Sequence, residues 1–160
     1  MSAKIGTSPV KLGDLSDKKL IKQTLEFFEN QIVKSNIENA IIITASNEVY
    51  HCTGDKNNIN TILELGNKLK GAYVTHNHPA DSDGNYSFSD LDVTLFMDYN
   101  LSVLRGIDER FVYELNRNMN DLDKLDLTLE EIINGLASRH FEVVRMAKLR
   151  QIGYWRWQRG

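Results

Sequence analysis

Residues 72–79 read AYVTHNHP and join a short apolar strand to the start of a loop. We predict a strand over residues 72–75 that ends on His76. Side chains alternate between the two faces of a strand, so His76 and His78 point in the same direction and both imidazoles can reach one metal ion. Pro79 stiffens the exit from the strand. This stretch therefore predicts a strand end that presents two candidate metal ligands.

The segment that follows is predicted to be a loop and then a helix. Residues 77–88 are rich in Asp, Ser, Gly, Asn and Pro, which favour turns over regular structure. A helix is predicted from Ser89 to about Asn100. Ser89 and Asp92 are three residues apart and lie on one face of this helix. The end of the loop thus offers a hydroxyl and a carboxylate, with Asp92 as the third candidate metal ligand.

The rest of the chain alternates between helical and strand patterns. Apolar residues at three- and four-residue steps predict amphipathic helices, and isoleucine-rich or alternating segments predict strands. The upstream elements are a helix over residues 17–34 with Ser16 as N-cap, a hairpin of strands 38–44 and 48–53 whose first strand is central, and a helix over 58–69 capped by Asn58 and closed by Gly71. The downstream elements are strands over 101–106 and 110–115 and a last helix from the capping box of Thr128 and Glu131 to Ile152.

These elements predict one α/β domain with a central mixed β-sheet flanked by helices. A chain of 160 residues, of which 41% are hydrophobic, is long enough to bury a single core. We divide it into a flexible N-terminal arm over residues 1–15, one domain over residues 16–152, and a basic aromatic C-terminal tail over residues 153–160.

Charge and hydropathy exclude several classes of protein. The chain has 19 basic and 22 acidic side chains, so it is neither polybasic nor strongly acidic. The apolar run at residues 40–43 is far shorter than the roughly 20 residues of a transmembrane helix. With no secretory signal pattern after Met1, we expect a cytoplasmic protein without a membrane partner. Cys52 is the only cysteine, which excludes an internal disulfide and a cysteine-rich zinc site.

Two neutral imidazoles and one carboxylate form the ligand set of an open catalytic zinc site, because a fourth position is left for water. Zinc lowers the pKa of such a water to about 7, and a nearby carboxylate must then take its proton. Glu38, on the first central strand, is the candidate general base that later protonates the leaving amine. Glu48, and Glu26 or Glu29 on the first helix, are its rivals. Ser89 is a candidate donor to the oxygen that becomes negative.

This set of residues resembles the JAMM metalloproteases, also called MPN+ or JAB domains. The signature of that family is an upstream Glu, then HxHP, then SxxD, and here these are Glu38, residues 76–79 and residues 89–92. The HNHP stretch is similar to the bacterial branch with RadC-like proteins and phage JAB domains, and the resemblance covers residues 23–116. It implies a cytidine-deaminase-like fold and a zinc-dependent peptidase or isopeptidase. The implied substrates are peptides or proteins, including conjugates of ubiquitin-like modifiers.

The spacing between the second histidine and the serine departs from the family pattern. Residues 79–88 form a longer gap than is usual, although lengthening a loop adds little closure entropy. A second register, Ser87 with Asp90, shortens the gap. We prefer Ser89 with Asp92, because that register begins a helix whose apolar face points inward.

Two other functions are consistent with the sequence. The first is a non-catalytic metal-binding module, such as a phage or mobile-element assembly component. Separately, Asp81 or Asp83 in the acidic loop can add a ligand and close the site, which favours a resting, inhibited form of the hydrolase. The second is a RadC-like nucleic-acid-associated protein, because basic residues interleaved with aromatics can bind a nucleic-acid backbone and stack on bases. The residues concerned are Arg145, Lys148, Arg150, Arg156 and Arg159 with Tyr154, Trp155 and Trp157. We favour a structural role for them, with the cations at a helix C-terminus and the aromatics covering the core or a partner surface, and do not expect a nucleic-acid partner.

Overall fold

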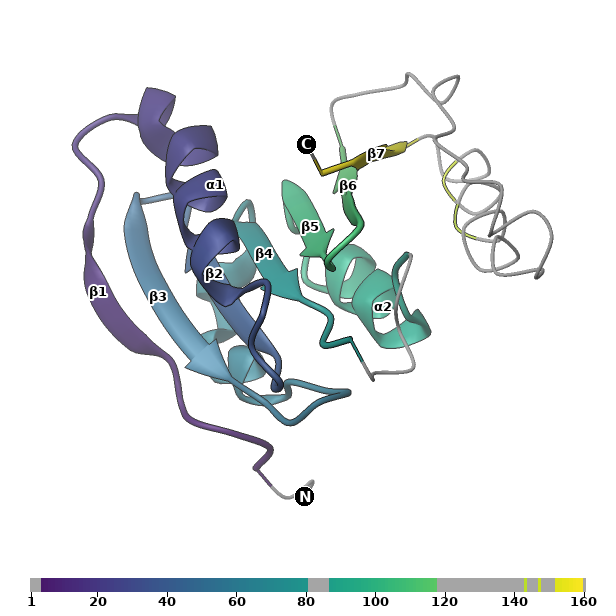
Figure 1. The fold of residues 1–160 in the computed structure, drawn as a ribbon. Helices are drawn as coiled ribbons and strands as arrows, with labels where there is room; N and C mark the ends of the chain where they lie inside the picture. The colour runs from purple at the N-terminus through teal and green to yellow at the C-terminus, as the bar shows by residue number, and fades with distance from the viewer. Residues whose placement is uncertain (1–3, 81–86, 118–142, 144–146, 148–151, 160) are drawn as a thin grey trace, which may run out of the picture.

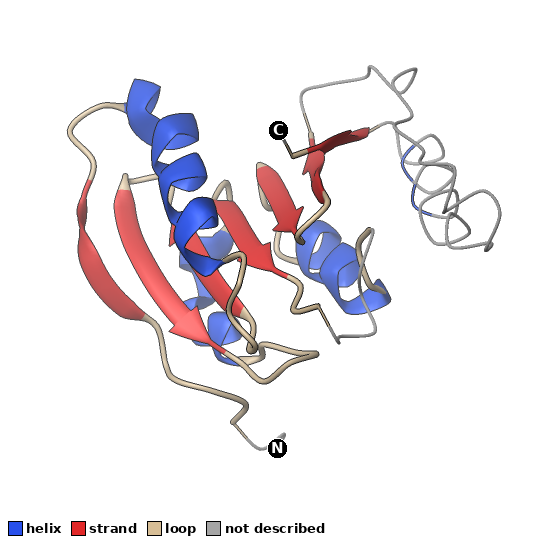
Figure 2. Cartoon of the chain, in the orientation of Figure 1, coloured by secondary structure: helices blue, strands red, loops and turns tan. Residues whose placement is uncertain are grey.

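The computed structural model describes residues 4–80, 87–117, 143, 147 and 152–159. These residues form a seven-stranded sheet of order β1-β3-β2-β4-β5-β6-β7, with helices on both faces (Figures 1 and 2). The elements are β1 (Val10–Asp14), the 3-10 helix η1 (Lys18–Leu20), α1 (Ile21–Ile32), β2 (Asn39–Ile43), β3 (Glu48–Thr53), the 3-10 helix η2 (Thr61–Leu69), β4 (Tyr73–Asn77), α2 (Asp90–Asp98), β5 (Val103–Ile107), β6 (Phe111–Asn116) and β7 (Gly153–Gln158).

The sheet is mixed, as predicted. Strands β4 and β5 pair in parallel, and every other pair of neighbours in the described sheet is antiparallel. The hairpin of β2 and β3 is confirmed, and β2 is central because it lies between β3 and β4. The α/β class with a mixed sheet flanked by helices is therefore confirmed.

Each face of the sheet is covered by a different helix layer. Helix α1 packs on one face, where Ile21 and Leu25 join Ile41, Ile43 and Val49 in one buried cluster. On the other face, η2 and α2 pack against the larger core. That core contains Ile62 and Leu69 from η2, Phe96 from α2, and Ile42, Val74 and Leu104 from the sheet. Because β2, β4 and β5 are covered by apolar residues, these strands hold the polar residues at their ends in fixed positions.

Two of the predicted helix caps differ from those in the structure. The predicted helix over residues 17–34 is present as η1 and α1, but its cap is Asp17, whose side chain accepts from the Lys19 amide at 2.9 Å, and not Ser16. Asn58 does not cap η2, which begins three residues later, at Thr61. Gly71 adopts a φ of 75°, which is the left-handed conformation expected after a helix.

The domain boundaries predicted at the two ends of the chain are corrected by the structure. Residues 10–14 pair with β3, so they belong to the sheet and not to a flexible arm. Residues 153–158 form β7, which pairs with β6 along its length. Tyr154 and Arg156 are buried, so this segment is part of the domain and not a tail. Its basic and aromatic side chains do not follow a strand pattern. The strand is defined by its pairing with β6.

Three predictions fall outside the described residues: the capping box of Thr128 and Glu131, the acidic loop residues Asp81 and Asp83, and the basic residues Arg145, Lys148 and Arg150. Of the predicted last helix, Val143 and Ala147 are described, and both are helical and buried. None of the described helices is long and apolar enough to cross a membrane.

Candidate metal centre

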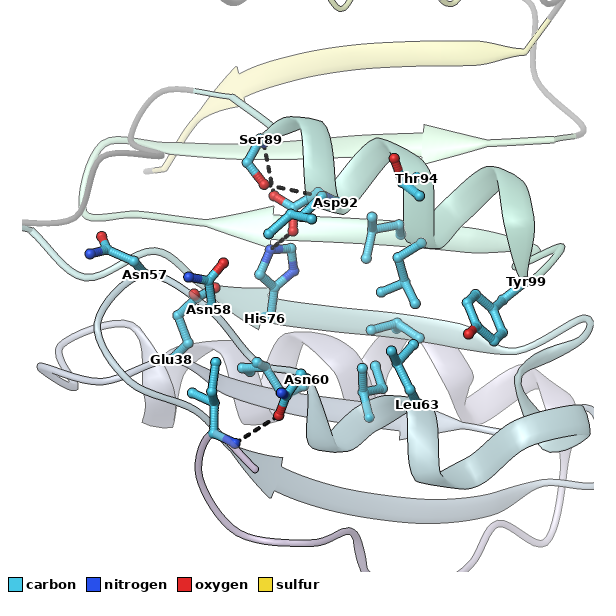
Figure 3. Close-up of a pocket in the computed structure, with 18 of the residues that line it drawn as sticks. Glu38, Asn57, Asn58, Asn60, Leu63, His76, Ser89, Asp92, Thr94 and Tyr99 are labelled. Atoms are coloured by element: carbon cyan, nitrogen blue, oxygen red, sulfur yellow. Dashed lines mark hydrogen bonds and ion pairs between the residues drawn. The ribbon is translucent and has the colours of Figure 1, made fainter. Parts of the chain in front are cut away.

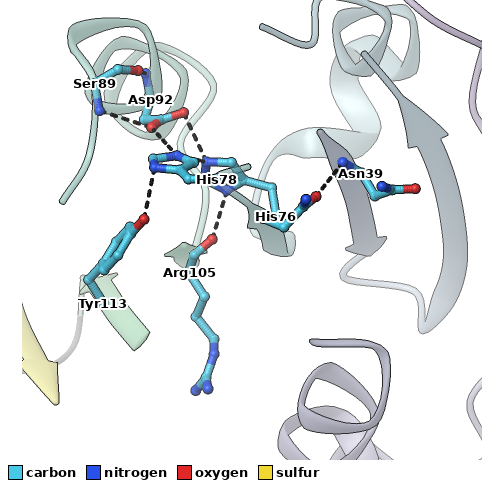
Figure 4. A network of polar contacts seen from close by, with 8 residues as sticks. Asn39, His76, His78, Ser89, Asp92, Arg105 and Tyr113 are labelled. Atoms are coloured by element: carbon cyan, nitrogen blue, oxygen red, sulfur yellow. Dashed lines mark hydrogen bonds and ion pairs between the residues drawn. The ribbon is translucent and has the colours of Figure 1, made fainter. Parts of the chain in front are cut away.

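The two histidines of the HNHP stretch converge at the end of β4. His76 is in the strand and His78 continues its pairing with β5, donating its amide to the Ile107 carbonyl at 2.7 Å. Both side chains are buried, and their Nε2 atoms lie 2.9 Å apart (Figure 4). Two ligands held 2.0–2.1 Å from one tetrahedral zinc ion are separated by roughly 3.3 Å. A shift of a few tenths of an ångström therefore fits this pair to a metal ion.

Asp92 bridges the two imidazoles from the first turn of α2. Its Oδ1 lies 3.1 Å from Nε2 of His76 and its Oδ2 lies 3.2 Å from Nε2 of His78. The carboxylate is held by a capping box, in which the Ser89 amide donates to Asp92 Oδ2 and the Asp92 amide donates to Ser89 Oγ. Sequence placed these residues on one helical face, and the structure shows why they are three apart: Ser89 is the N-cap and Asp92 is N3.

The alternative register places its residues elsewhere. Asp90 is exposed, whereas Asp92 is directed at the histidines. Ser87 is buried in the core, with its hydroxyl 2.7 Å from that of Tyr154. The structure therefore brings Ser89 and Asp92 to the histidines, and not Ser87 and Asp90.

Hydrogen bonds on the far side of each ring set the direction of its Nε2 atom. Nδ1 of His76 lies 2.8 Å from the Arg105 carbonyl, which can only accept, so Nδ1 carries the proton and Nε2 is the nitrogen available to a metal ion. Nδ1 of His78 lies 2.8 Å from the Tyr113 hydroxyl. Tyr113 reaches across β5 because residue 106 is glycine: a Cβ there would lie 2.1 Å from the Tyr113 ring.

Glu38 lies beside the same pair of histidines, immediately before β2. It is only 5% exposed, and among the described residues its Oε2 has no hydrogen-bond partner. One of its oxygens lies within 4.8 Å of the ligand nitrogens of His76 and His78, and these three groups could hold a metal ion. Burial raises the pKa of Glu38 to about 7, against the opposing effect of the two imidazoles. A carboxyl with this pKa can both accept and donate a proton near neutral pH.

Asn77, the residue between the two histidines, fixes the backbone on both sides of Glu38. Its side chain points to the opposite face from the histidines, where its Oδ1 accepts from the Asn39 amide at 2.6 Å. Its Nδ2 donates to the Ile37 carbonyl at 2.9 Å. One carboxamide thus ties the segment that carries Glu38 to the strand that carries both candidate ligands.

The other glutamates considered as general bases do not join this arrangement. Glu29 is on the α1 face of the sheet, where both of its oxygens bond to Arg105 at 2.7 and 2.9 Å. Glu26 is exposed on α1. Glu48 is the first residue of β3, at the turn of the β2–β3 hairpin, and forms ion pairs with Lys11 and Lys68. Of the four candidates, only Glu38 lies beside the histidines.

The charges of the cluster depend on one another. Burial lowers the pKa of His76, but the charge of Asp92 and a hydrogen bond to it outweigh this effect and raise the pKa to about 9. Burial raises the pKa of Asp92, but the two histidines hold it well below its usual value. At neutral pH, His76 and Asp92 therefore form an imidazolium–carboxylate pair.

Sequence patterns did not identify Asn77 or Tyr113 as parts of the site. Asn77 was treated only as the spacer between two ligands, and its amide partners lie 38 and 40 residues away in the chain. Tyr113 is in a strand that was predicted, but its approach to His78 depends on the pairing of β6 with Gly106 of β5. Such contacts follow from sheet register, which local patterns do not determine.

The chain matches no protein-family model, no curated protein and no solved structure. The resemblance to the JAMM family therefore depends on the motif residues and their arrangement alone.

Proposed function

We propose that this protein is a zinc-dependent hydrolase of peptide or isopeptide bonds, with His76, His78 and Asp92 as the metal ligands. The observation that carries the proposal is the buried carboxyl of Glu38, which lacks a hydrogen-bond partner for Oε2 among the described residues and lies beside the two histidines. A buried and unsatisfied carboxyl reduces the stability of a protein, so its presence in such a cluster favours a role in proton transfer.

The chain's residues divide the chemistry between them. When bound, zinc polarises the substrate carbonyl and lowers the pKa of water to about 7. Glu38 accepts a proton as the water oxygen bonds to the carbonyl carbon, and it passes that proton to the amine nitrogen as the C–N bond breaks. Ser89 Oγ accepts the capping bond from the Asp92 amide, which leaves its own O–H to donate to the negative oxygen of the tetrahedral intermediate. The products are a carboxylic acid and an amine.

The candidate site lines a cavity. Glu38, His76, Ser89 and Asp92 all line one cavity of about 450 Å³ between η2 and α2 (Figure 3). Figure 3 shows Glu38 and Asp92 on either side of His76, so a bond placed over the imidazole lies between the proposed base and the proposed ligand.

Zinc content and hydrolysis measured on the same protein test this proposal. Purified protein should hold about one zinc per chain and cleave generic peptides or ubiquitin-like fusions. Glu38→Gln should keep the zinc and lose activity by about 10²- to 10⁴-fold, the usual contribution of a general acid–base group. Glu26→Gln, the same change at an exposed site on α1, should retain full activity. Equal activity of the wild type and the Glu38→Gln variant would refute the assignment of the base.

A second candidate function is a non-catalytic metal-binding module. The observation that favours it is that Glu38, His76 and His78 are close enough to act together as ligands. If Glu38 and Asp92 both bind the ion, four protein ligands close the site, as in structural zinc sites. In that case Glu38→Gln loses zinc, whereas the hydrolase proposal requires it to keep zinc.

A further inference from the structure

The cavity that contains the candidate site extends well beyond the residues that hydrolysis would use. Glu38, His76 and Asp92 lie at one end, and Leu63 and Tyr99 lie at the other (Figure 3). The volume of about 450 Å³ lies between α2 and η2, over strands of the sheet. Since the proposed reaction uses only the first end, the rest of this volume can receive another part of the substrate.

Aliphatic side chains form most of the wall of this extension. They are Ile59, Ile62, Leu63, Val74, Leu95 and Leu104, and the polar residues Thr94, Asp98 and Tyr99 also line the cavity. No lysine or arginine is among the described residues that line the cavity, and its charged residues are the acidic Glu38, Asp92 and Asp98. An acidic side chain would be repelled there, and a polar one would lose its hydration against the aliphatic part of the wall.

Two leucines beside the cavity are unusually exposed for their type. Leu63 on η2 is 42% exposed and Leu91 on α2 is 64% exposed, and both contribute to the lining. They lie on the two helices that enclose the volume. Covering this apolar surface is favourable, so an apolar group that enters between the helices gains binding free energy from both walls.

We propose that this cavity binds a large apolar side chain, of the leucine, isoleucine, methionine or phenylalanine class, carried by a substrate residue next to the cleaved amide bond. This inference rests on the proposed hydrolase function and names its substrate class. The cavity is continuous with the candidate metal centre, so the side chain and the bond it flanks occupy the site together. A glycine at that position leaves the cavity unfilled, and such substrates are cleaved poorly.

Leucine-scanned peptides test this proposal. The substrates are acetylated, amidated hexapeptides of glycine and serine in which a single leucine occupies each position in turn. With the zinc-loaded wild type, leucine at one position should raise kcat/KM by about ten-fold or more over the parent peptide. Glutamate at the same position should remove the gain. Equal kcat/KM for all peptides, or a preference for glycine, would overturn the proposal.

A pair of matched variants tests whether the cavity is responsible. Leu63→Asn should reduce the leucine preference several-fold, because it replaces an exposed wall residue with a polar one of similar size. Leu12→Asn makes the same change at a leucine that is 50% exposed on β1, outside the cavity, and should leave the preference unchanged. An unaltered preference in Leu63→Asn would contradict the assignment of the cavity.

Binding separates this inference from the hydrolase proposal. Calorimetry with zinc-loaded Glu38→Gln protein measures the affinity for the same hexapeptides without turnover. If the wild type cleaves none of them but the variant binds one leucine peptide about ten-fold more tightly than the parent, the hydrolase proposal fails and the apolar site stands. If the wild type cleaves peptides but neither cleavage nor binding depends on leucine, the apolar site fails and hydrolysis stands.

Discussion

Replacing Glu38 with glutamine should stabilise the metal-free protein at pH 8. Glutamine has nearly the same shape as glutamate but carries no charge. Burial raises the pKa of Glu38 from 4.5 to about 7, and at 1.36 kcal/mol for each pKa unit this corresponds to about 3 kcal/mol. The folded state binds the proton more tightly than the unfolded state, so this loss of stability develops as pH rises from 4.5 to 7 and is complete above pH 7.

Urea denaturation of both proteins in the presence of a chelator measures the difference. At pH 8, Glu38→Gln should gain roughly 2–3 kcal/mol in free energy of unfolding, reduced by whatever partners the new carboxamide lacks. At pH 5 the gain should fall to about 1 kcal/mol or less, because the folded carboxyl is then protonated. Glu26→Gln, at an exposed position, should stay within about 0.5 kcal/mol of the wild type at both pH values. A variant that is no more stable than the wild type at pH 8, or whose gain in stability is the same at both pH values, would refute the claim that ionisation of the buried Glu38 carboxyl destabilises the folded protein.

Three further predictions concern the ligands and the backbone around them. Asp92→Ala should lose zinc, whereas Asp90→Ala, two positions away and exposed, should keep it. If metal analysis gives the reverse, the register of Ser87 with Asp90 is correct and that of Ser89 with Asp92 is wrong. Because the pKa of His76 is about 9, zinc binding at pH 7.5 should release about one proton from it, which calorimetry in buffers of different ionisation enthalpy detects; zero release would mean that His76 is already neutral. Asn77→Ala frees the backbone around Glu38, so it should retain zinc but lower kcat by roughly 10- to 100-fold, and unchanged kcat would show that Asn77 does not position the base.

The parts of the site that sequence predicted are those set by local geometry. His76 and His78 converge because side chains alternate along a strand, and Asp92 meets Ser89 because N-cap and N3 are neighbours in a first helical turn. Local geometry alone does not place Glu38 beside these residues. Its position depends on the pairing of Ala40 with His76 across β2 and β4. The sequence predicts that the first strand of the hairpin is central, but it does not predict this register.

The parts that sequence did not predict depend on contacts between distant segments. Residues 10–14 and 153–158 lack a strong alternating pattern, so their membership of the sheet becomes visible only through pairing with β3 and β6. Glu29 was a candidate base, although it follows Leu25 by four residues and precedes Ile32 by three on the buried stripe of α1. That position alone indicates burial, but its partner Arg105, 76 residues away, cannot be read from the helix pattern.

The central claim is that one metal ion is bound by His76, His78 and Asp92 and leaves a position open next to Glu38. A crystal structure of the wild-type protein grown with zinc tests it most directly. The expected result is a zinc ion bonded to both Nε2 atoms and to the Asp92 carboxylate, with the Glu38 carboxyl facing the open side of the ion and not bonded to it. A zinc ion bonded to Glu38 as a fourth protein ligand, or no zinc at these residues, would contradict the account.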